Sequence, residues 1–238
     1  MNSQTEKIPG LSVHNIAKQR INPGAALVLA TMSAVAATFG DFLMLYVVNA
    51  NSAQNLPSHE TILLPLGYFL GLFAIPLYGF GFWAIAKIFE PGALRAGRFV
   101  LVSGVMMAII GGIIHGVTGI TIEAQLRADA SHLAPIAALL EYSVYLMPLW
   151  AIASVLSFIG AIGFASGVIS GKTIFSPFIA LFNPVVLTVV IGLVGTMTPA
   201  IQVFLIPAAP NAAHVLFFGM LTVLFFWSVP TDEKVTVL

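Results

Sequence analysis

Four ionisable side chains lie inside long apolar stretches of the sequence: Asp41, His115, Glu141 and His214. A charge in an apolar environment is unfavourable, so such residues are candidates for function wherever a segment is apolar enough to enter a membrane. Carboxylates and imidazoles can exchange a proton, hydrogen-bond a polar ligand or ligate a metal ion. Cys is absent from the 238 residues, which excludes thiolate nucleophiles, disulfides and Cys-ligated metals.

These four residues allow three interpretations, which the sequence leaves open. In the first, they pair with one another and only fix helix packing, because an unpaired buried polar group is unfavourable. In the second, our working hypothesis, they line an outward-facing pocket that binds or transports a small molecule or lipid. In the third, all four ligate a divalent metal, as in an intramembrane hydrolase. No H-E-x-x-H motif is present, so no enzymatic activity is assigned.

The composition predicts that these residues lie in transmembrane helices. Hydrophobic residues make up 59% of the chain and charged residues 8%, whereas about a quarter of a soluble domain is charged. A membrane-spanning helix needs about 20 apolar residues. We therefore predict an all-α polytopic membrane protein, a six-transmembrane-helix bundle over residues 23–229, with tails at 1–22 and 230–238. The predicted spans are about 23–48, 59–87, 97–121, a stretch within 132–169, 183–206 and 212–229.

Asn and Pro residues set several of these boundaries. Asn-Pro pairs at 22–23 and 183–184 begin the first and fifth spans, because Asn caps free N–H groups and Pro is tolerated at the first helical position. We expect Pro76 to bend the second span. The Pro-rich residues 207–211 are expected to form a tight connection between the fifth and sixth spans.

The four ionisable residues share one depth in this arrangement. Asp41 follows Pro23 by about 27 Å of helix, which places it in the outer half of the first span. His115 lies near the outer end of the third span, and Glu141 and His214 lie early in spans that enter from outside. Small residues recur on the same faces as Asp41 and His115, which predicts close packing against other helices. Further candidates for the pocket lining are Tyr68, Tyr145, Gln202 and Asn211.

The distribution of Lys and Arg predicts the orientation. Of the nine Lys and Arg residues, all but Arg127 fall on one side of the six-helix arrangement. Cytoplasmic loops are enriched in these residues, so both termini are predicted to be cytoplasmic. The nine acidic residues balance the basic ones, and no basic patch is present that would bind nucleic acid. The expected partners are the lipid bilayer and a small-molecule or lipid ligand.

Short motifs spread over the chain resemble an uncharacterised family of small bacterial six-helix membrane proteins. The resemblance implies a bacterial cytoplasmic (inner) membrane and brings no known activity. It includes Asp41, His115 and His214, whereas Glu141 is a candidate from its predicted depth alone. The motifs are Gly40-Asp41-Phe42-Leu43-Met44, Pro76-Leu77-Tyr78-Gly79, His115, Pro210-Asn211-Ala212-Ala213-His214 and Phe217-Phe218.

Overall fold

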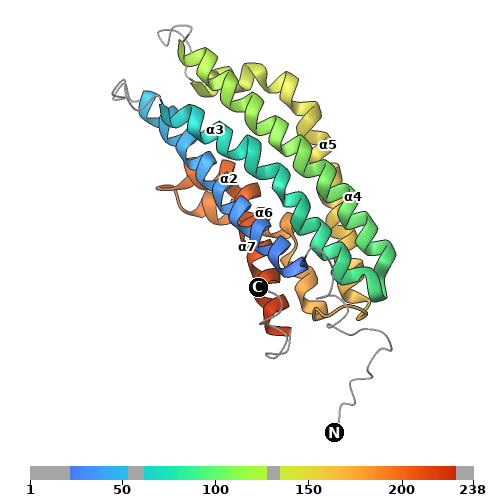
Figure 1. The fold of residues 1–238 in the computed structure, drawn as a ribbon. Helices are drawn as coiled ribbons and strands as arrows, with labels where there is room; N and C mark the ends of the chain where they lie inside the picture. The colour runs from blue at the N-terminus through green and yellow to red at the C-terminus, as the bar shows by residue number, and fades with distance from the viewer. Residues whose placement is uncertain (1–21, 53–61, 128–134, 229–238) are drawn as a thin grey trace.

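The computed structural model describes residues 22–52, 62–127 and 135–228, and in these ranges the chain is helical with no strand (Figure 1). The all-α prediction is therefore confirmed. The elements are α2 (Pro23–Ser52), α3 (Leu63–Ala74), the 3-10 turn η2 (Ile75–Leu77), α4 (Tyr78–Arg127), α5 (Pro135–Ile169), the 3-10 segment η3 (Pro177–Phe182), α6 (Pro184–Met197) and α7 (Gln202–Ser228).

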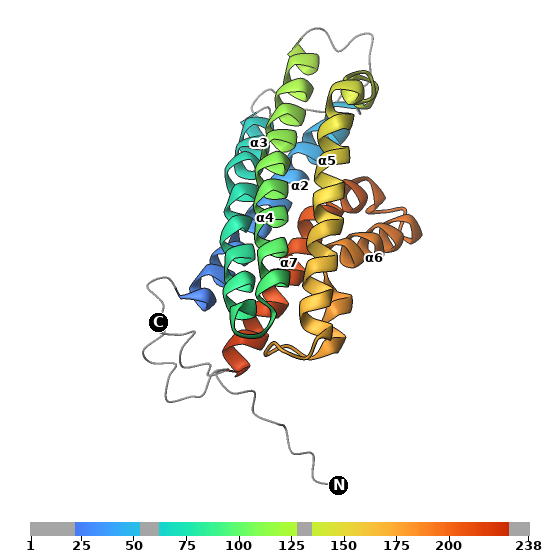
Figure 2. The same cartoon turned by 90° about the vertical axis from the view of Figure 1, so that its right-hand side faces the viewer.

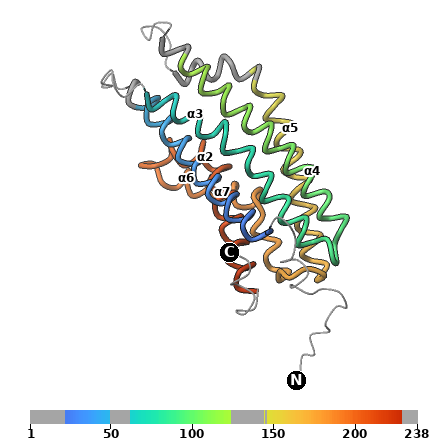
Figure 3. Tube along the Cα trace, viewed as in Figure 1, coloured from blue at the N-terminus to red at the C-terminus, as the bar shows by residue number. Residues whose placement is uncertain are grey.

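Helix α2 begins where the Asn-Pro pair predicts, with the Asn22 side chain accepting a hydrogen bond from the Gly24 N–H at 2.8 Å. Its small residues Ala30, Ala34 and Ala37 are fully buried. A Cβ added at Gly24 would lie 2.9 Å from Phe225 Cε1, so the start of α2 packs against the end of α7. The two helices are antiparallel, and these two ends lie at the same end of the bundle (Figures 1 and 3).

Helices α3 and α4 form a long antiparallel hairpin. Pro76 lies in η2, so the helix tightens to a 3-10 turn where the sequence predicts a disturbance. Ala93 has φ −138° and ψ 43°, and at this residue α4 folds back on itself (Figure 1). The first limb of this hairpin comprises α3, η2 and α4 up to Ala93, and the second limb is the rest of α4. The two limbs meet at glycines of the second limb: a Cβ at Gly112 would lie 3.0 Å from Pro76, and one at Gly116 would lie 3.0 Å from Leu72. The small-residue face of the predicted third span therefore faces protein.

Helix α5 packs along the second limb of α4 (Figure 2). The contact is close at glycines of α5, because a Cβ at Gly160 would lie 3.0 Å from Ser103 Oγ and one at Gly163 3.1 Å from Phe99 Cβ. Small residues let two helices approach each other in this way. Helix α5 begins at Pro135 and ends at Ile169, within the predicted stretch 132–169.

The C-terminal helices differ from the prediction. Helix α6 begins at Pro184 as expected but ends at Met197, and the connection at 198–201 contains Pro199. The predicted connection at 207–211 is wrong, because α7 runs through Pro207 and Pro210 without a break. The neighbouring Ala208 is fully buried, so packing against the bundle keeps these residues helical although each Pro lacks an N–H for the helix.

Helix α6 and the first turns of α7, residues 202–210, project sideways from the bundle, and we call this hairpin the shelf (Figure 2). Contacts with α2 support that direction. The Asn211 amide reaches Asp41, and the Phe204 ring lies 6.5 Å from the ring of Phe42, the next residue of α2. Residues 204 and 211 thus both lie beside neighbouring residues of α2, so the chain between them runs across α2 and not along it.

Within the described residues, four helical stretches are long and apolar enough to cross a membrane, namely Pro23–Asn49, Leu63–Glu123, Leu146–Ile169 and Gln202–Ser228. The second comprises 61 residues and includes both limbs of the α3–α4 hairpin. Helix α6 has 14 residues and a length of about 21 Å, below the roughly 30 Å of a bilayer's hydrocarbon core. The predicted fifth span is thus not one membrane-length helix.

Candidate functional site

Asp41 and His115 form a buried polar pair between α2 and α4. Asp41 Oδ1 lies 3.3 Å from His115 Nδ1, and the two residues are 8% and 6% exposed. The other ring nitrogen of His115, Nε2, lies 3.3 Å from the carbonyl oxygen of Gly67 in α3. A carbonyl oxygen only accepts hydrogen bonds, so Nε2 carries a hydrogen in this contact. With that hydrogen on Nε2, the contact between Asp41 Oδ1 and His115 Nδ1 is a hydrogen bond when one exchangeable proton lies between the two atoms.

Glycines of α2 and α3 make room for this pair. A Cβ at Gly71 would overlap the imidazole ring of His115. A Cβ at Gly67 would lie 2.8 Å from the carbonyl oxygen of Gly40, and one at Gly40 would lie 2.6 Å from that of Gly67. Because these glycines have no side chains, α2 and α3 approach each other closely, and the Gly67 carbonyl is free to accept the hydrogen bond from His115 Nε2.

Asn211 and Tyr78 extend the pair toward α7 and the start of α4. The Asn211 Nδ2 amide donates to Asp41 Oδ2 at 2.8 Å, and the Tyr78 hydroxyl donates to Asn211 Oδ1 at 2.9 Å. Tyr78 is 1% exposed. Side chains from α2, α4 and α7, with the α3 carbonyl, therefore form one hydrogen-bonded chain, which we call the polar network: Asp41, His115, Asn211 and Tyr78.

His214 lies next to the polar network but is not hydrogen-bonded to it. Its ring stacks on Tyr78, with centroids 4.9 Å apart and planes at 25°. Its Nδ1 lies 2.7 Å from the Pro210 carbonyl oxygen, which can only accept, so Nδ1 carries the hydrogen. The other nitrogen, Nε2, is buried and has no hydrogen-bond partner in the part of the chain that the structure describes. His214 Nε2 therefore keeps an unpaired lone pair, although the His214 side chain is only 6% exposed.

A cavity of about 790 Å³ opens beside the polar network. Its walls come from the second half of α2, the second limb of α4, the middle of α5 and the shelf. Most of the lining is apolar, and the polar side chains on it include Asp41, His115, Tyr78, Asn211 and His214. The cavity lies in the half of the bundle away from the start of α2 and the end of α7.

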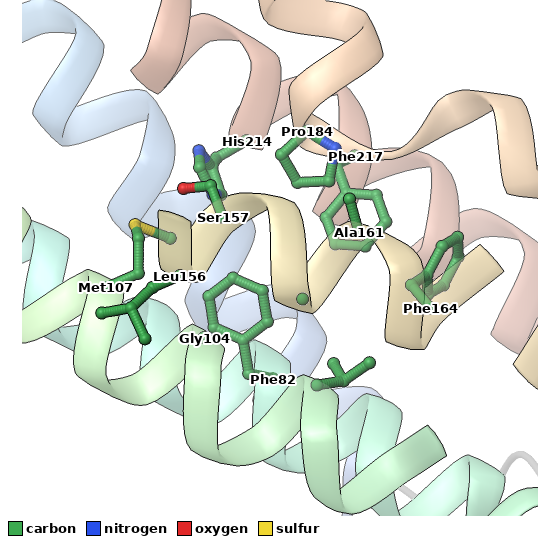
Figure 4. A pocket seen from close by; sticks show the side chains of 12 residues that line it. Phe82, Gly104, Met107, Leu156, Ser157, Ala161, Phe164, Pro184, His214 and Phe217 are labelled. Atoms are coloured by element: carbon green, nitrogen blue, oxygen red, sulfur yellow. The ribbon is translucent and has the colours of Figure 1, made fainter. Parts of the chain in front are cut away.

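A second cavity, of about 20 Å³, is also lined by His214 (Figure 4). Phe82, Phe164 and Phe217 line it together with Pro184 at the start of α6. A space of this size suits one water molecule. His214 and Ser157 line both cavities, so they lie in the wall between them.

The remaining predicted site residues lie elsewhere or are not described. The Tyr68 hydroxyl donates to Glu123 Oε2 at 3.1 Å, and Tyr68 is not part of the large cavity's lining. Gln202 lines that cavity. Glu141 belongs to α5 by its backbone, but its side chain and that of Tyr145 are outside the described residues. Their predicted place in the pocket stays a prediction.

A metal centre finds no support in the described part of the chain, where no three His, Asp or Glu side chains gather closely enough to hold an ion. Asp41 and His115 are close, but both His115 nitrogens have protein partners. Because the Glu141 side chain is not described, the predicted four-residue metal site of Asp41, His115, Glu141 and His214 stays a hypothesis.

The sequence interpretation missed three residues that build the site: Tyr78, Gly67 and Gly71. Tyr78 belongs to the motif after Pro76 but was not a pocket candidate, because no pattern indicates its partner Asn211. A signal for the glycines does exist. Gly67-Tyr68-Phe69-Leu70-Gly71 is a G-x-x-x-G spacing, which marks a close-packed face in apolar helices.

Comparison with known proteins gives a family and no activity. The sequence model of a family of unknown function (DUF6796) matches residues 21–226, which include every element described above except the last residues of α7. The resemblance to an uncharacterised family is therefore confirmed. No curated protein and no solved structure matches the chain.

Proposed function

We propose that this chain, which belongs to the family of unknown function DUF6796, is a multi-pass membrane protein that binds a small amphiphile or lipid in its large cavity. The observation that carries the proposal is the cavity itself. Its volume of about 790 Å³ falls within the range of roughly 300–1,000 Å³ found for small-molecule sites. Apolar walls next to a compact set of polar groups suit a ligand with an apolar tail and a polar end.

The outer surface of the helices supports a membrane location. Large apolar side chains are exposed around the bundle, for example Phe99 (60%), Val102 (64%) and Val155 (58%). Soluble monomers rarely expose wide apolar surfaces, whereas lipid-facing helices do so along their length. The resemblance stated above suggests the bacterial inner membrane.

In the proposed topology, α2, the two limbs of the α3–α4 hairpin and α5 cross the bilayer. Of the six predicted spans, the last two then form a re-entrant hairpin of η3, α6 and α7, which enters and leaves on one side. An apolar helix as short as α6 is typical of re-entrant segments. This topology keeps both termini on the cytoplasmic side, which is where the Lys and Arg residues place them. The large cavity then lies in the outer half.

The experiment is a thermal-shift measurement with the protein in phosphatidylcholine nanodiscs. The probes are decylamine, decanol, decanoate and decyltrimethylammonium. At least one probe should raise the melting temperature with saturation, because a ligand that binds only the folded state stabilises it. Ser154→Trp should abolish the shift by filling the cavity, since Ser154 lines it. Val155→Trp is the matched control, because Val155 is the next residue, is 58% exposed and does not line the cavity.

The opposing function is purely structural, and one observation favours it. The polar network satisfies its own hydrogen bonds without a ligand. A structural role predicts that none of the probes shifts the melting temperature, or that each shifts Ser154→Trp as much as the unmodified protein. Either result would refute the proposed binding function.

A further inference from the structure

Several polar groups that line the large cavity present hydrogen-bond acceptors, beside the N–H donors of Asn49, Trp150 and Gln202. Two of the lining hydroxyls use their hydrogens inside the protein: Ser157 donates to the Ala153 carbonyl at 2.8 Å and Thr188 to the Pro184 carbonyl at 2.7 Å. Tyr78 likewise donates to Asn211. Each hydroxyl oxygen keeps a lone pair that a ligand donor can use. No Lys or Arg is among the lining residues that the structure describes.

The shelf adds acceptors of a further kind, which are backbone carbonyls. Pro207 and Pro210 have no N–H, so the carbonyls of Val203 and Ile206, four residues earlier, lack their usual helical donors. All four residues line the cavity. The His214 side chain lines the same cavity, but its Nε2 atom, which has no partner in the described residues, is itself buried. A ligand that presents hydrogen-bond donors would satisfy these groups, and one that presents only acceptors would not.

The charge of the cavity can adapt to a cation. The titratable side chains among the described lining residues are Asp41 (α2), His115 and Tyr78 (α4) and His214 (α7). Asp41 and His115 together carry one exchangeable proton, and with it the pair has no net charge. If this proton leaves, Asp41 is a carboxylate beside a neutral imidazole that still donates from Nε2 to Gly67. The pair then carries one negative charge, which would suit a ligand with one positive charge.

Resting on the proposed binding function, we infer that the ligand is an amphiphile with a primary ammonium group, which binds between Asp41 and the acceptors of the shelf. A primary ammonium supplies three donors and one positive charge. One proton leaves the Asp41–His115 pair for the solvent as the cation enters, so the charge of the site stays at zero. The apolar tail lies along the walls formed by α4 and α5.

Calorimetric titration in phosphatidylcholine nanodiscs tests this inference. Decylamine is titrated in phosphate and in Tris, whose different ionisation enthalpies report the number of protons released. We expect about one proton released per decylamine bound, because the free amine already carries its proton at pH 7. Decanol and decanoate should bind at least roughly tenfold more weakly, since they lose a charge-assisted hydrogen bond. Ethanolamine, which lacks the tail, should bind more weakly still.

Two variants assign the proton to the pair. Asp41→Asn should weaken decylamine binding roughly tenfold or more and abolish proton release, because it removes the anion. His115→Gln keeps the Asp41 carboxyl group and should still bind decylamine, and any proton it releases then comes from Asp41 alone. Equal affinities of decanol and decylamine, or proton release unchanged in both variants, would overturn the inference while the proposed function stands. If no tailed probe binds, the proposed function itself fails.

A lipid headgroup and a free amphiphile share the ammonium chemistry, and the nanodisc composition separates them. Phosphatidylethanolamine carries a primary ammonium and phosphatidylcholine does not. If the headgroup is the ligand, exchanging the lipid should lower the apparent affinity for decylamine by competition. If a free amphiphile is the ligand, the affinity should stay the same.

Discussion

Gly71 holds the position of the polar network although it has no polar side chain. The imidazole of His115 occupies the space where a Cβ at Gly71 would lie. Any side chain there would push the ring away from both of its partners, Asp41 and the Gly67 carbonyl. The geometry of the pair therefore depends on a residue of α3, a helix that contributes no side chain to the network.

Gly71→Ala should lower the stability by about 1–3 kcal/mol through overpacking, seen as a lower melting temperature in nanodiscs. Gly79→Ala is the matched control, because its nearest neighbour would be Val105 at 3.6 Å, an ordinary contact. It should leave the melting temperature unchanged or raise it, since Ala favours helix. In a His115→Ala background, the effect of Gly71→Ala should largely disappear. Equal effects of both glycine variants would disprove this role.

The contact between Asp41 and His115 predicts that their mutational effects are coupled. A double-mutant cycle of Asp41→Asn and His115→Gln should give an interaction energy of about 0.5–3 kcal/mol in thermal unfolding. Each single variant leaves a buried partner with a poorer hydrogen bond, and the second substitution then removes less. Strict additivity of the two effects would mean that the residues do not interact.

At the residue scale, the sequence indicates which ionisable groups are buried but not how they connect. Asp41 and His115 follow from their apolar surroundings and their small-residue faces. The roles of Tyr78 and Asn211 as a bridge could not be predicted, because residues 78 and 211 meet only through the packing of α4 and α7. Likewise, only the observed ring orientation shows that His214 uses Nδ1 and leaves Nε2 unpaired.

At the scale of elements, the start of α6 is unusual because the helix begins inside the protein. Asn183 is 6% exposed, and its Oδ1 accepts hydrogen bonds from the N–H groups of Val185 and Val186, both at 3.1 Å. Its amide also donates to the Ala180 carbonyl at 2.9 Å. One side chain therefore satisfies backbone groups on both sides of the break between η3 and α6.

Asn183→Ala should cost about 1–2 kcal/mol of stability or more, because it removes a buried cap and leaves two partly buried N–H groups without their acceptor. Asn22→Ala is the control, since Asn22 caps α2 in the same way from a half-buried position at the end of the bundle. Its cost should be smaller. If the melting temperature fell equally in both variants, the special role of Asn183 at the break between η3 and α6 would be contradicted.

The sequence predicts the elements up to α5 and the start of α6, because long apolar runs, capping residues and Pro76 act locally. It does not predict the shelf. Pro207 and Pro210 suggested a turn by their composition, but the burial of Ala208 and Ala209 against the bundle outweighs that preference. Tertiary packing of this kind has no counterpart in the local pattern.

At the scale of the whole molecule, the proposed topology predicts which positions are accessible from each side. The chain has no Cys, so each introduced Cys is a single reporter. In inverted and right-side-out vesicles, Asn51→Cys should react with an impermeant thiol reagent only from outside, and Lys172→Cys only from inside. Ala200→Cys, at the tip of the shelf, should react only with a membrane-permeant reagent. If the impermeant reagent reacted with Ala200→Cys from outside, the proposed re-entrant hairpin would be wrong and the six predicted membrane crossings would be right.

The composition and the Lys and Arg asymmetry lead to the apolar, all-helical architecture without any structural information. The large cavity could not be predicted in this way. It arises because the shelf projects sideways and leaves α5 separated from the second half of α2, an arrangement of whole elements. The predicted depths suggested that the polar residues lie at one level of the membrane. Whether a cavity is present at that level depends on how all the helices pack.

The most direct test of the central claim, that the large cavity binds an amphiphile, is tryptophan fluorescence quenching. Trp150 lines the cavity, whereas Trp227 is 82% exposed and does not line it. Phe replaces two of the three Trp residues to leave either Trp150 or Trp227, and a decylamine brominated in its chain is added to each variant in nanodiscs. The account predicts saturable quenching of Trp150, absent for Trp227 and relieved by unbrominated decylamine. Quenching of both residues to the same degree, without saturation, would contradict it.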